Sequence, residues 1–143
     1  MDTNIRLMVV VQKLNMTFNS TMGKNISDLG LTTSEFIVLA HLNNKEKEKI
    51  QNLAKIAFVT SGTATYIVNK LINQGYVMKN QDDRDKRVFW ISITDNGEKR
   101  YLAVFRKHMI YLNKVLGKFS EKEKLEFIEQ VKYFGKHIEE SEQ

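Results

Sequence analysis

The sequence predicts a mainly α-helical protein with one small antiparallel β-hairpin. The chain of 143 residues contains no proline, which favours long helices because proline breaks a helix interior. Apolar residues recur at spacings of three and four along most of the chain, a pattern typical of amphipathic helices. On either side of the polar segment 80–87 this spacing changes to two, as expected for two strands joined by a turn.

The composition predicts one soluble globular domain. Apolar residues make up 42% of the chain and charged residues 27%, which is ordinary for a folded soluble protein. The absence of cysteine excludes disulfides, thiol catalysis and cysteine-ligated metal sites. The apolar run at residues 7–11 is too short for a signal peptide or a membrane span. We therefore expect a cytoplasmic protein.

The N-terminal third contains two expected helices. Apolar residues in the segment 3–25 form a wide stripe, which predicts a helix of roughly 20 residues that packs on two sides. A helix at a subunit interface and an ordinary core helix fit this pattern equally well. After Gly30, the spacing of Thr32 and Glu35 predicts a capping box for a second helix that continues to residue 42.

The middle third contains two short helices and the hairpin. The first helix is expected at residues 50–57, and a turn at 58–60 leads to the second at 61–73, with Thr60 or Ser61 as its N-cap. Gly75 stands where a helix commonly ends in a glycine. Strands are expected at 76–79 and 88–93. This order of elements is that of a winged helix-turn-helix, in which the hairpin is the wing.

The remaining residues predict two long helices. Thr94 is the expected cap of one, which Gly117 ends, and Ser120 with Glu123 forms a capping box for the other. Both carry more apolar residues than a small domain needs, as expected for a dimer interface. We therefore assign residues 1–30 and 95–143 to a helical dimerisation region that flanks the winged helix-turn-helix at 31–94.

The charge distribution favours a polyanionic partner. The net charge is +5. Residues 44–100 hold eleven basic and seven acidic side chains, and this net charge of +4 is nearly all of the positive excess of the chain. A localised basic field suits double-stranded DNA, although a solvated basic surface remains the alternative.

The second short helix has the side chains that a groove-binding helix needs. Small hydroxyl residues at its N-terminal end permit close approach to base edges, and the free amides of a helix N-terminus attract phosphate. The alternative is a solvated Ser/Thr-rich face. The expected DNA contacts from this helix are Thr60, Ser61, Gly62, Thr63, Thr65, Tyr66 and Lys70.

The hairpin tip adds three basic residues, Arg84, Lys86 and Arg87, among three aspartates. Arginine inserted into a narrow minor groove reads DNA shape, and a neighbouring aspartate can hold the guanidinium by a bidentate contact. Because the net charge of residues 82–87 is zero, a mutually neutralised solvent loop is the alternative.

Five segments together resemble the MarR family of bacterial transcriptional regulators. They are Leu31–Phe36, Ser61–Leu71, Asn73–Val77, the triplet Asp85-Lys86-Arg87 and Ile93–Gly97. The resemblance implies a homodimer that binds a pseudo-palindromic operator, usually as a repressor. By position, Arg87 matches the minor-groove arginine and Asp85 the aspartate that orients it, with Arg84 and Lys86 as phosphate contacts. Tyr66 departs from the family pattern, in which many members carry arginine.

The resemblance also implies a small aromatic or phenolic effector, bound in a cleft between the DNA-binding unit and the dimer helices. The segment 60–75 looks closest to a branch of the family associated with quinone and catechol responses. Each candidate cleft residue is more often a packing residue than a ligand contact. The candidates are Asn15, Phe36, His41, Met109 and Tyr111.

No cofactor is expected. The three histidines, His41, His108 and His137, lack metal-binding spacing, and no catalytic or phosphate-binding motif supports a small hydrolase. The remaining alternative is a winged helix that binds protein rather than DNA. Such a module would need an apolar outer face on the helix at 61–73, where this sequence has polar residues.

Overall fold

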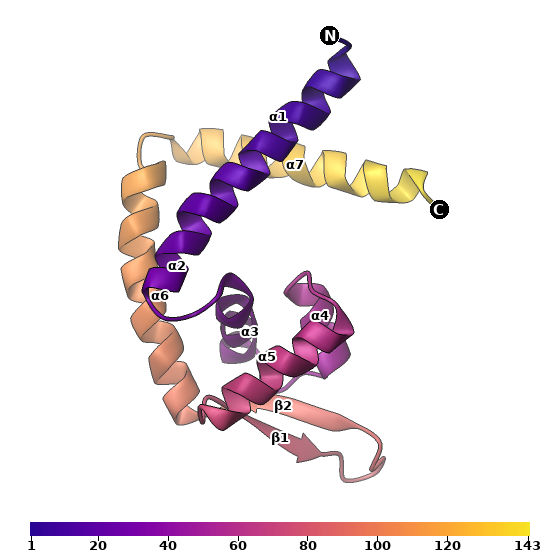
Figure 1. Ribbon diagram of the computed structural model, residues 1–143, viewed down its shortest axis with the longest axis vertical. Helices are drawn as coiled ribbons and strands as arrows, with labels where there is room; N and C mark the ends of the chain where they lie inside the picture. The colour runs from indigo at the N-terminus through magenta and orange to yellow at the C-terminus, as the bar shows by residue number, and fades with distance from the viewer. The chain divides into compact units, whose positions relative to one another are not determined.

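The computed structural model describes residues 1–143 and is mainly helical with one hairpin (Figure 1), which confirms the predicted fold class. The chain divides into two compact parts, residues 1–109 and 110–143. The helices are α1 (Thr3–Phe18), a π-helical segment η1 (Asn19–Gly23), α2 (Lys24–Asp28), α3 (Thr33–Asn44), α4 (Ile50–Ile56), α5 (Ser61–Asn73), α6 (Asp95–Leu116) and α7 (Glu121–Ser141); the strands are β1 (Val77–Gln81) and β2 (Phe89–Ile93).

The helix expected at residues 3–25 is interrupted by the π-helical segment η1. The hydroxyl of Thr21 donates to the carbonyl oxygen of Thr17 at 2.6 Å, and that of Ser20 donates to the same oxygen at 3.1 Å. Such side-chain bonds compete with the regular backbone ladder. The periodicity of apolar residues does not detect this change, because the chain keeps turning in the same sense.

The capping box of α3 is confirmed. The backbone N–H of Glu35 donates to the hydroxyl of Thr32 at 3.1 Å, and that of Thr32 donates to the Glu35 carboxylate at 3.2 Å. The helix continues two residues beyond the expected end, to Asn44. The side-chain amide of Asn44 donates to the carbonyl oxygen of Ala40 at 3.0 Å, which satisfies one of the last carbonyls of the helix.

The helix-turn-helix forms as predicted, and α5 has the expected bounds of residues 61–73. Thr60 caps it by accepting the backbone N–H of Thr63 at 3.2 Å. At its far end Gly75 has a φ of +77°, a conformation that residues with a side chain rarely adopt. In the turn before α5, Phe58 has a φ of +56° and is exposed.

The two strands of the wing pair in antiparallel fashion from Val77↔Ile93 to Gln81↔Phe89. Strand β1 therefore starts one residue later than expected and reaches two residues into the polar segment, because cross-strand pairing rather than polarity sets its end. A third segment joins the sheet, since Glu48 and Ile91 exchange backbone hydrogen bonds of 2.9 and 2.8 Å. The wing is thus attached to the loop that precedes α4.

One apolar core holds the helix-turn-helix and the base of the wing together. It includes side chains that are almost fully buried, among them Leu39, Leu53, Leu71 and Ile91. Helix α6 begins beside β1. There, Thr94 accepts the backbone N–H of Gly97 at 3.0 Å and donates to the carbonyl oxygen of Gly75 at 2.6 Å. This confirms Thr94 as a cap.

Residues 110–143 contain the end of α6 and the whole of α7. The capping box of Ser120 and Glu123 is confirmed, with reciprocal bonds of 3.1 and 2.7 Å. No side chain of α7 is buried, although its sequence is amphipathic. None of the helices combines the length and apolarity needed to span a bilayer.

Candidate nucleic-acid interface

The N-terminal half of α5 presents small polar residues to solvent. Residues Ala64, Ile67, Val68 and Leu71 face the core, so the opposite side of the helix is free. All but one of the seven contacts expected here are exposed: Thr60, Ser61, Gly62, Thr63, Thr65 and Tyr66. The hydroxyl of Thr65 donates to the carbonyl oxygen of Ser61 at 3.0 Å, which still leaves its oxygen lone pairs available as acceptors.

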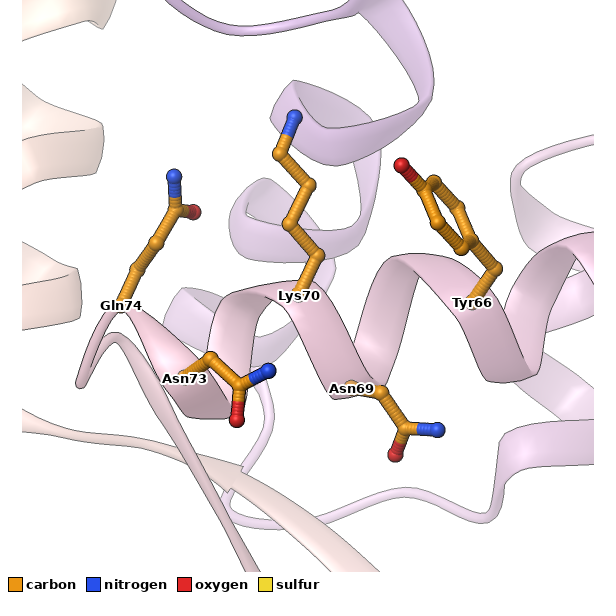
Figure 2. A pocket seen from close by; sticks show the side chains of 5 residues that line it. All are labelled: Tyr66, Asn69, Lys70, Asn73 and Gln74. Carbon is orange, nitrogen blue, oxygen red and sulfur yellow. The ribbon is translucent and has the colours of Figure 1, made fainter.

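Lys70, the seventh, has a partner inside the protein. Its ammonium donates to the Glu35 carboxylate at 2.6 Å, and Figure 2 shows the side chain rising from α5 toward α3. This hydrogen bond and the negative charge of Glu35 raise the pKa of Lys70. Glu35 is only 2% exposed, so the pair links a buried carboxylate of α3 to α5. The expected phosphate contact of Lys70 stays a prediction beside this structural role.

A shallow hollow of about 430 Å³ lies along the outer side of α5 (Figure 2). Tyr66, Lys70 and Gln74 stand on one side of it, and Asn69 and Asn73 on the other. Each of these five side chains carries a polar group, whereas a protein-binding helix would carry aliphatic residues at these positions.

The wing tip presents an arginine in a fixed orientation. The Arg87 guanidinium donates to both carboxylate oxygens of Asp85, from Nε at 3.0 Å and from Nη2 at 3.1 Å. The backbone N–H of Arg87 also donates to Asp85, at 3.0 Å. These bonds lower the pKa of the Asp85 carboxyl. The Arg87 side chain remains 90% exposed. Asp85 therefore orients the guanidinium on one side, and the remainder of the Arg87 side chain faces solvent. Arg84 and Lys86 are exposed in the same loop.

Asp82 also shapes this loop, and the sequence reasoning did not single it out. Its carboxylate accepts the backbone N–H groups of Arg84 at 3.1 Å and Asp85 at 3.0 Å, and the Trp90 indole N–H at 2.9 Å. The bonds from Asp85, Trp90 and Arg84 lower the pKa of Asp82 to about 2. An aspartate two and three residues before the amides it accepts is a recognisable turn signal, whereas the contact with Trp90 is not.

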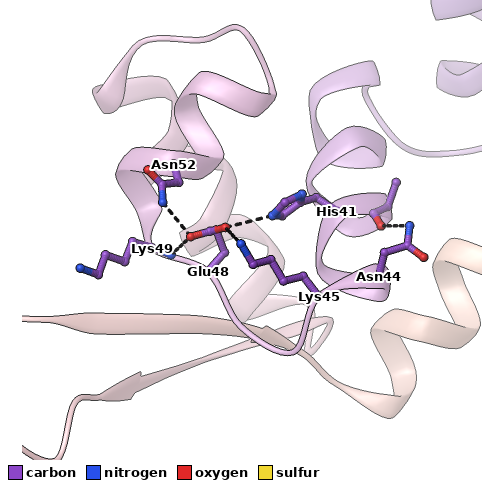
Figure 3. Close-up of polar contacts among 7 residues, drawn as sticks. His41, Asn44, Lys45, Glu48, Lys49 and Asn52 are labelled. Atoms are coloured by element: carbon purple, nitrogen blue, oxygen red, sulfur yellow. Dashed lines mark hydrogen bonds and ion pairs between the residues drawn. The ribbon is translucent and has the colours of Figure 1, made fainter.

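A buried carboxylate fixes the base of the wing. Glu48 is 4% exposed and accepts hydrogen bonds from His41, Lys45 and Asn52 and from the backbone of Lys49, at 2.9–3.1 Å (Figure 3). Burial raises the pKa of Glu48, but the bonds from Asn52, Lys49, His41 and Lys45 outweigh it and lower that pKa to about 2. The cluster ties α3 and α4 to the segment that pairs with β2.

The five candidates for an effector cleft lie in different surroundings. The ring centroid of Phe36 lies 5.5 Å from that of Tyr101 and 5.7 Å from that of His108, whereas His41 belongs to the Glu48 cluster. Asn15 is exposed on α1 and accepts from the Asn19 amide at 3.3 Å. Met109 is half-buried at the end of the first compact part, and Tyr111 belongs to the second.

No group of three or more His, Asp or Glu side chains is arranged to hold a metal ion. The candidate interface therefore consists of two solvent-facing surfaces of the first compact part: the polar N-terminal half of α5 and the basic loop of the wing. A hydroxyl-bearing helix and an oriented guanidinium are both suited to hydrogen bonding with the grooves of a duplex.

Comparisons with known sequences point the same way. The family model described as transcriptional regulator SarA/Rot matches residues 21–103. The HTH-type transcriptional regulator MhqR of Bacillus subtilis is 27% identical over 134 residues, covering 94% of this chain and 92% of that relative. The HTH-type transcriptional regulator SarZ of Staphylococcus aureus is 36% identical over 73 residues, about half of each chain.

Solved structures share the fold at low sequence identity. AbsC, a MarR family transcriptional regulator from Streptomyces coelicolor, superposes with a TM-score of 0.83 at 15% identity, covering 97% of this chain and 96% of AbsC. The organohalide-sensing transcriptional regulator RdhR, solved with 2,4-dichlorophenol bound, gives a TM-score of 0.80 at 15% identity over 96% of this chain and 82% of RdhR.

Proposed function

Because the chain belongs to the SarA/Rot family of transcriptional regulators, which has a MarR-type winged helix, we propose that it binds a pseudo-palindromic operator as a homodimer and represses transcription. The chain is a DNA-binding transcriptional regulator, and its family is one of regulators rather than enzymes. In the proposed complex α5 of each subunit enters the major groove, and each wing enters the adjacent minor groove. Its place of action is then the cytoplasm, where bacterial DNA lies.

The observation that carries this proposal is the bidentate contact between Asp85 and Arg87 at the wing tip. An exposed arginine normally samples many rotamers, and fixing it on binding costs about 0.5–1.5 kcal/mol. Here the contact with Asp85 orients the guanidinium before DNA arrives, which lowers that cost. An arginine so oriented suits a narrow minor groove with its strong negative potential.

The exposed residues of α5 support major-groove binding. Thr60, Ser61, Gly62 and Thr63 form the first turn. Thr60 caps the backbone N–H of Thr63, and the amides of Ser61 and Gly62 are the ones proposed to bind a phosphate. Apart from the neighbouring residues and backbone of its own helix, no atom lies within 4 Å of the position that a Cβ on Gly62 would occupy, so the surface is open there. Thr65 and Tyr66 continue this face and are the proposed base-edge contacts, since hydroxyl groups both donate and accept.

The exposed apolar residues of α1 and α7 support a homodimer. A stripe of this kind is unfavourable in water unless another surface covers it. Two recognition helices also need a spacing of about 34–36 Å to read two half-sites of a duplex, which a dimer provides. On α1 the exposed apolar residues include Met8, Val10, Val11 and Met16; on α7 they include Leu125, Val131, Phe134 and Ile138.

The experiment that tests the proposal is operator binding by the variant Arg87→Ala. The operator is first obtained by selecting random DNA fragments with the purified protein. We expect Arg87→Ala to weaken binding to that operator by about 1–3 kcal/mol, measured by fluorescence anisotropy at fixed salt, with sedimentation velocity showing an unchanged oligomeric state.

The matched control is Arg106→Ala, which removes the same charge from an exposed position of α6 and should bind nearly as well as the wild type. Equal binding by wild type and Arg87→Ala would remove the wing from the interface. Selection that enriches no sequence, together with affinity that does not depend on salt, would favour a protein-binding winged helix instead.

We also propose that a small aromatic or phenolic ligand regulates the protein, near the aromatic cluster of Phe36, Tyr101 and His108. Phenol binding by the structural neighbour RdhR supports this class of ligand. A ligand shifts an equilibrium only by its differential affinity for the two states. Titration with substituted phenols should therefore raise the melting temperature and lower operator affinity together, and a panel that changes neither would exclude the class.

A further inference from the structure

Asp82 stands at the point where β1 gives way to the wing loop, and it connects three parts of the wing. One carboxylate oxygen accepts the Trp90 indole N–H at 2.9 Å, so it is bonded to strand β2. The other accepts the backbone N–H groups of Arg84 at 3.1 Å and Asp85 at 3.0 Å, so it is bonded to the loop. The Trp90 ring is covered by the Lys47 ammonium, 4.7 Å from its centroid.

These bonds continue into the contact that orients Arg87. The amide of Asp85 is held by Asp82, and the carboxylate of Asp85 accepts three hydrogen bonds from Arg87, each 3.0–3.1 Å long. Two carboxylates therefore act in series between a strand residue and the exposed guanidinium. Asp83 lies between them in the sequence and is exposed.

We propose that Asp82 is a positioning residue for DNA recognition: through the loop backbone it holds Asp85, and hence Arg87, in the orientation that enters the minor groove, and Trp90 locks Asp82 in place. This inference rests on the proposed role of Arg87 at DNA. It assigns Asp82 and Trp90 an effect on DNA affinity although neither needs to touch the duplex.

The sign of the effect separates positioning from simple electrostatics. Asp82 is an anion near the phosphates of a bound duplex, so removing its charge should by itself strengthen binding. If Asp82 orders the loop, the loop of a variant without Asp82 becomes ordered only when DNA binds. The free energy of that ordering then weakens the complex. A weaker complex after removal of a negative charge therefore indicates positioning.

The test compares Asp82→Ala, Asp83→Ala, Arg87→Ala and the double variant Asp82→Ala/Arg87→Ala in operator binding at one salt concentration. Asp82→Ala removes three hydrogen bonds. We expect it to bind about 3- to 10-fold more weakly, the range for ordering one side chain on binding. Asp83→Ala, the charge-matched control, should bind within about twofold of the wild type or more tightly. The double variant should bind no more weakly than Arg87→Ala, because Asp82 acts only through Arg87.

A spectroscopic readout keeps the test decisive if Asp82→Ala also lowers stability. The chain has one tryptophan, so an NMR spectrum of the protein contains a single indole N–H resonance, that of Trp90. Asp82→Ala should shift that resonance in the free protein, whereas Asp83→Ala should not. The milder variant Trp90→Phe removes the indole donor and leaves the hydrogen bonds from the backbone amides of Arg84 and Asp85 to Asp82. It should therefore weaken operator binding less than Asp82→Ala.

The outcomes for this inference and for the proposed function are distinguishable. If Arg87→Ala binds the operator weakly and Asp82→Ala binds it like the wild type, the positioning role is overturned. The proposed contact between the wing and DNA then still holds. Losses that add in the double variant overturn it too, because Asp82 then acts independently of Arg87. Wild-type binding by Arg87→Ala removes the wing from the proposed function, and the positioning role fails with it.

Discussion

At the residue scale, carboxylates organise the DNA-binding unit. Glu35 joins α3 to α5 through Lys70, Glu48 joins α3 and α4 to the wing sheet, and Asp82 joins a strand to the wing tip. Glu35 and Glu48 are buried, and each is paired with a cation and hydrogen bonded, as burial of a charge requires. Acidic residues in this basic protein are therefore the groups that fix the geometry of its surfaces.

The low pKa of Glu48 predicts a loss of stability in acid. Its pKa of about 2 in the folded protein lies below its usual value of 4.5, so it stabilises the fold above pH 4.5, and this contribution disappears as the pH falls from 4.5 toward 2. The difference corresponds to about 3 kcal/mol. Glu48→Gln should lower the free energy of unfolding at pH 7 by a similar order and flatten its fall below pH 4.5, as measured by urea denaturation.

The control for this prediction is Glu46→Gln, which removes a charge from an exposed position two residues earlier. It should leave both the stability at pH 7 and its acid dependence nearly unchanged. An acid dependence that is the same in Glu48→Gln and in the wild type would show that Glu48 titrates normally in the folded protein.

At the element scale, the accuracy of the sequence-based bounds follows from how local each signal is. Helix α5 was predicted to the residue because Thr60, the apolar stripe and Gly75 all act within a few positions. The bounds of β1 were off by one and two residues because its pairing with β2 is decided across the hairpin. The segment η1 was missed because a π-turn leaves the spacing of apolar residues almost unchanged.

Packing between elements escaped prediction for the same reason. The partner of Lys70 lies 35 positions away in the sequence, and nothing in either local pattern joins the two. The third segment of the wing sheet is formed by a single bridge at Glu48, within a charged run that reads as a loop. Contacts of this kind depend on how the helices pack, which residue spacing does not describe.

At the scale of the whole molecule, the charge and the apolar surface are segregated. Residues 44–100, which include α4, α5 and the wing, carry +4 of the net charge of +5, and this positive charge attracts DNA over distances up to about 10 Å at moderate salt. The N-terminal and C-terminal helices instead carry the largest set of exposed apolar side chains. This separation suits a protein that binds nucleic acid with one region and a second copy of itself with another.

The apolar stripe of α7 predicts that charge placed there will break the proposed dimer. Leu125→Glu and Phe134→Glu each put a carboxylate on an exposed apolar residue of α7, and burying it in an interface costs several kcal/mol. We expect each variant to shift from dimer to monomer in sedimentation velocity. Operator affinity should fall as well, because one subunit reads only one half-site.

Gln130→Glu is the matched control, since it adds the same charge to α7 at a polar, exposed position; it should remain dimeric. Wild-type protein that sediments as a monomer at micromolar concentration would contradict the homodimer.

The sequence by itself determined the helices and hairpin, the caps at Thr32, Thr94 and Ser120, and the resemblance that led to a DNA-binding regulator. Each of these depends on residues close together in the chain, whose spacing sets which face is apolar and which backbone groups are capped. Only the tertiary structure decided that Lys70 pairs with Glu35 and that Asp82 bonds to Trp90. Those contacts join elements through space, where burial and geometry rather than spacing select the partner.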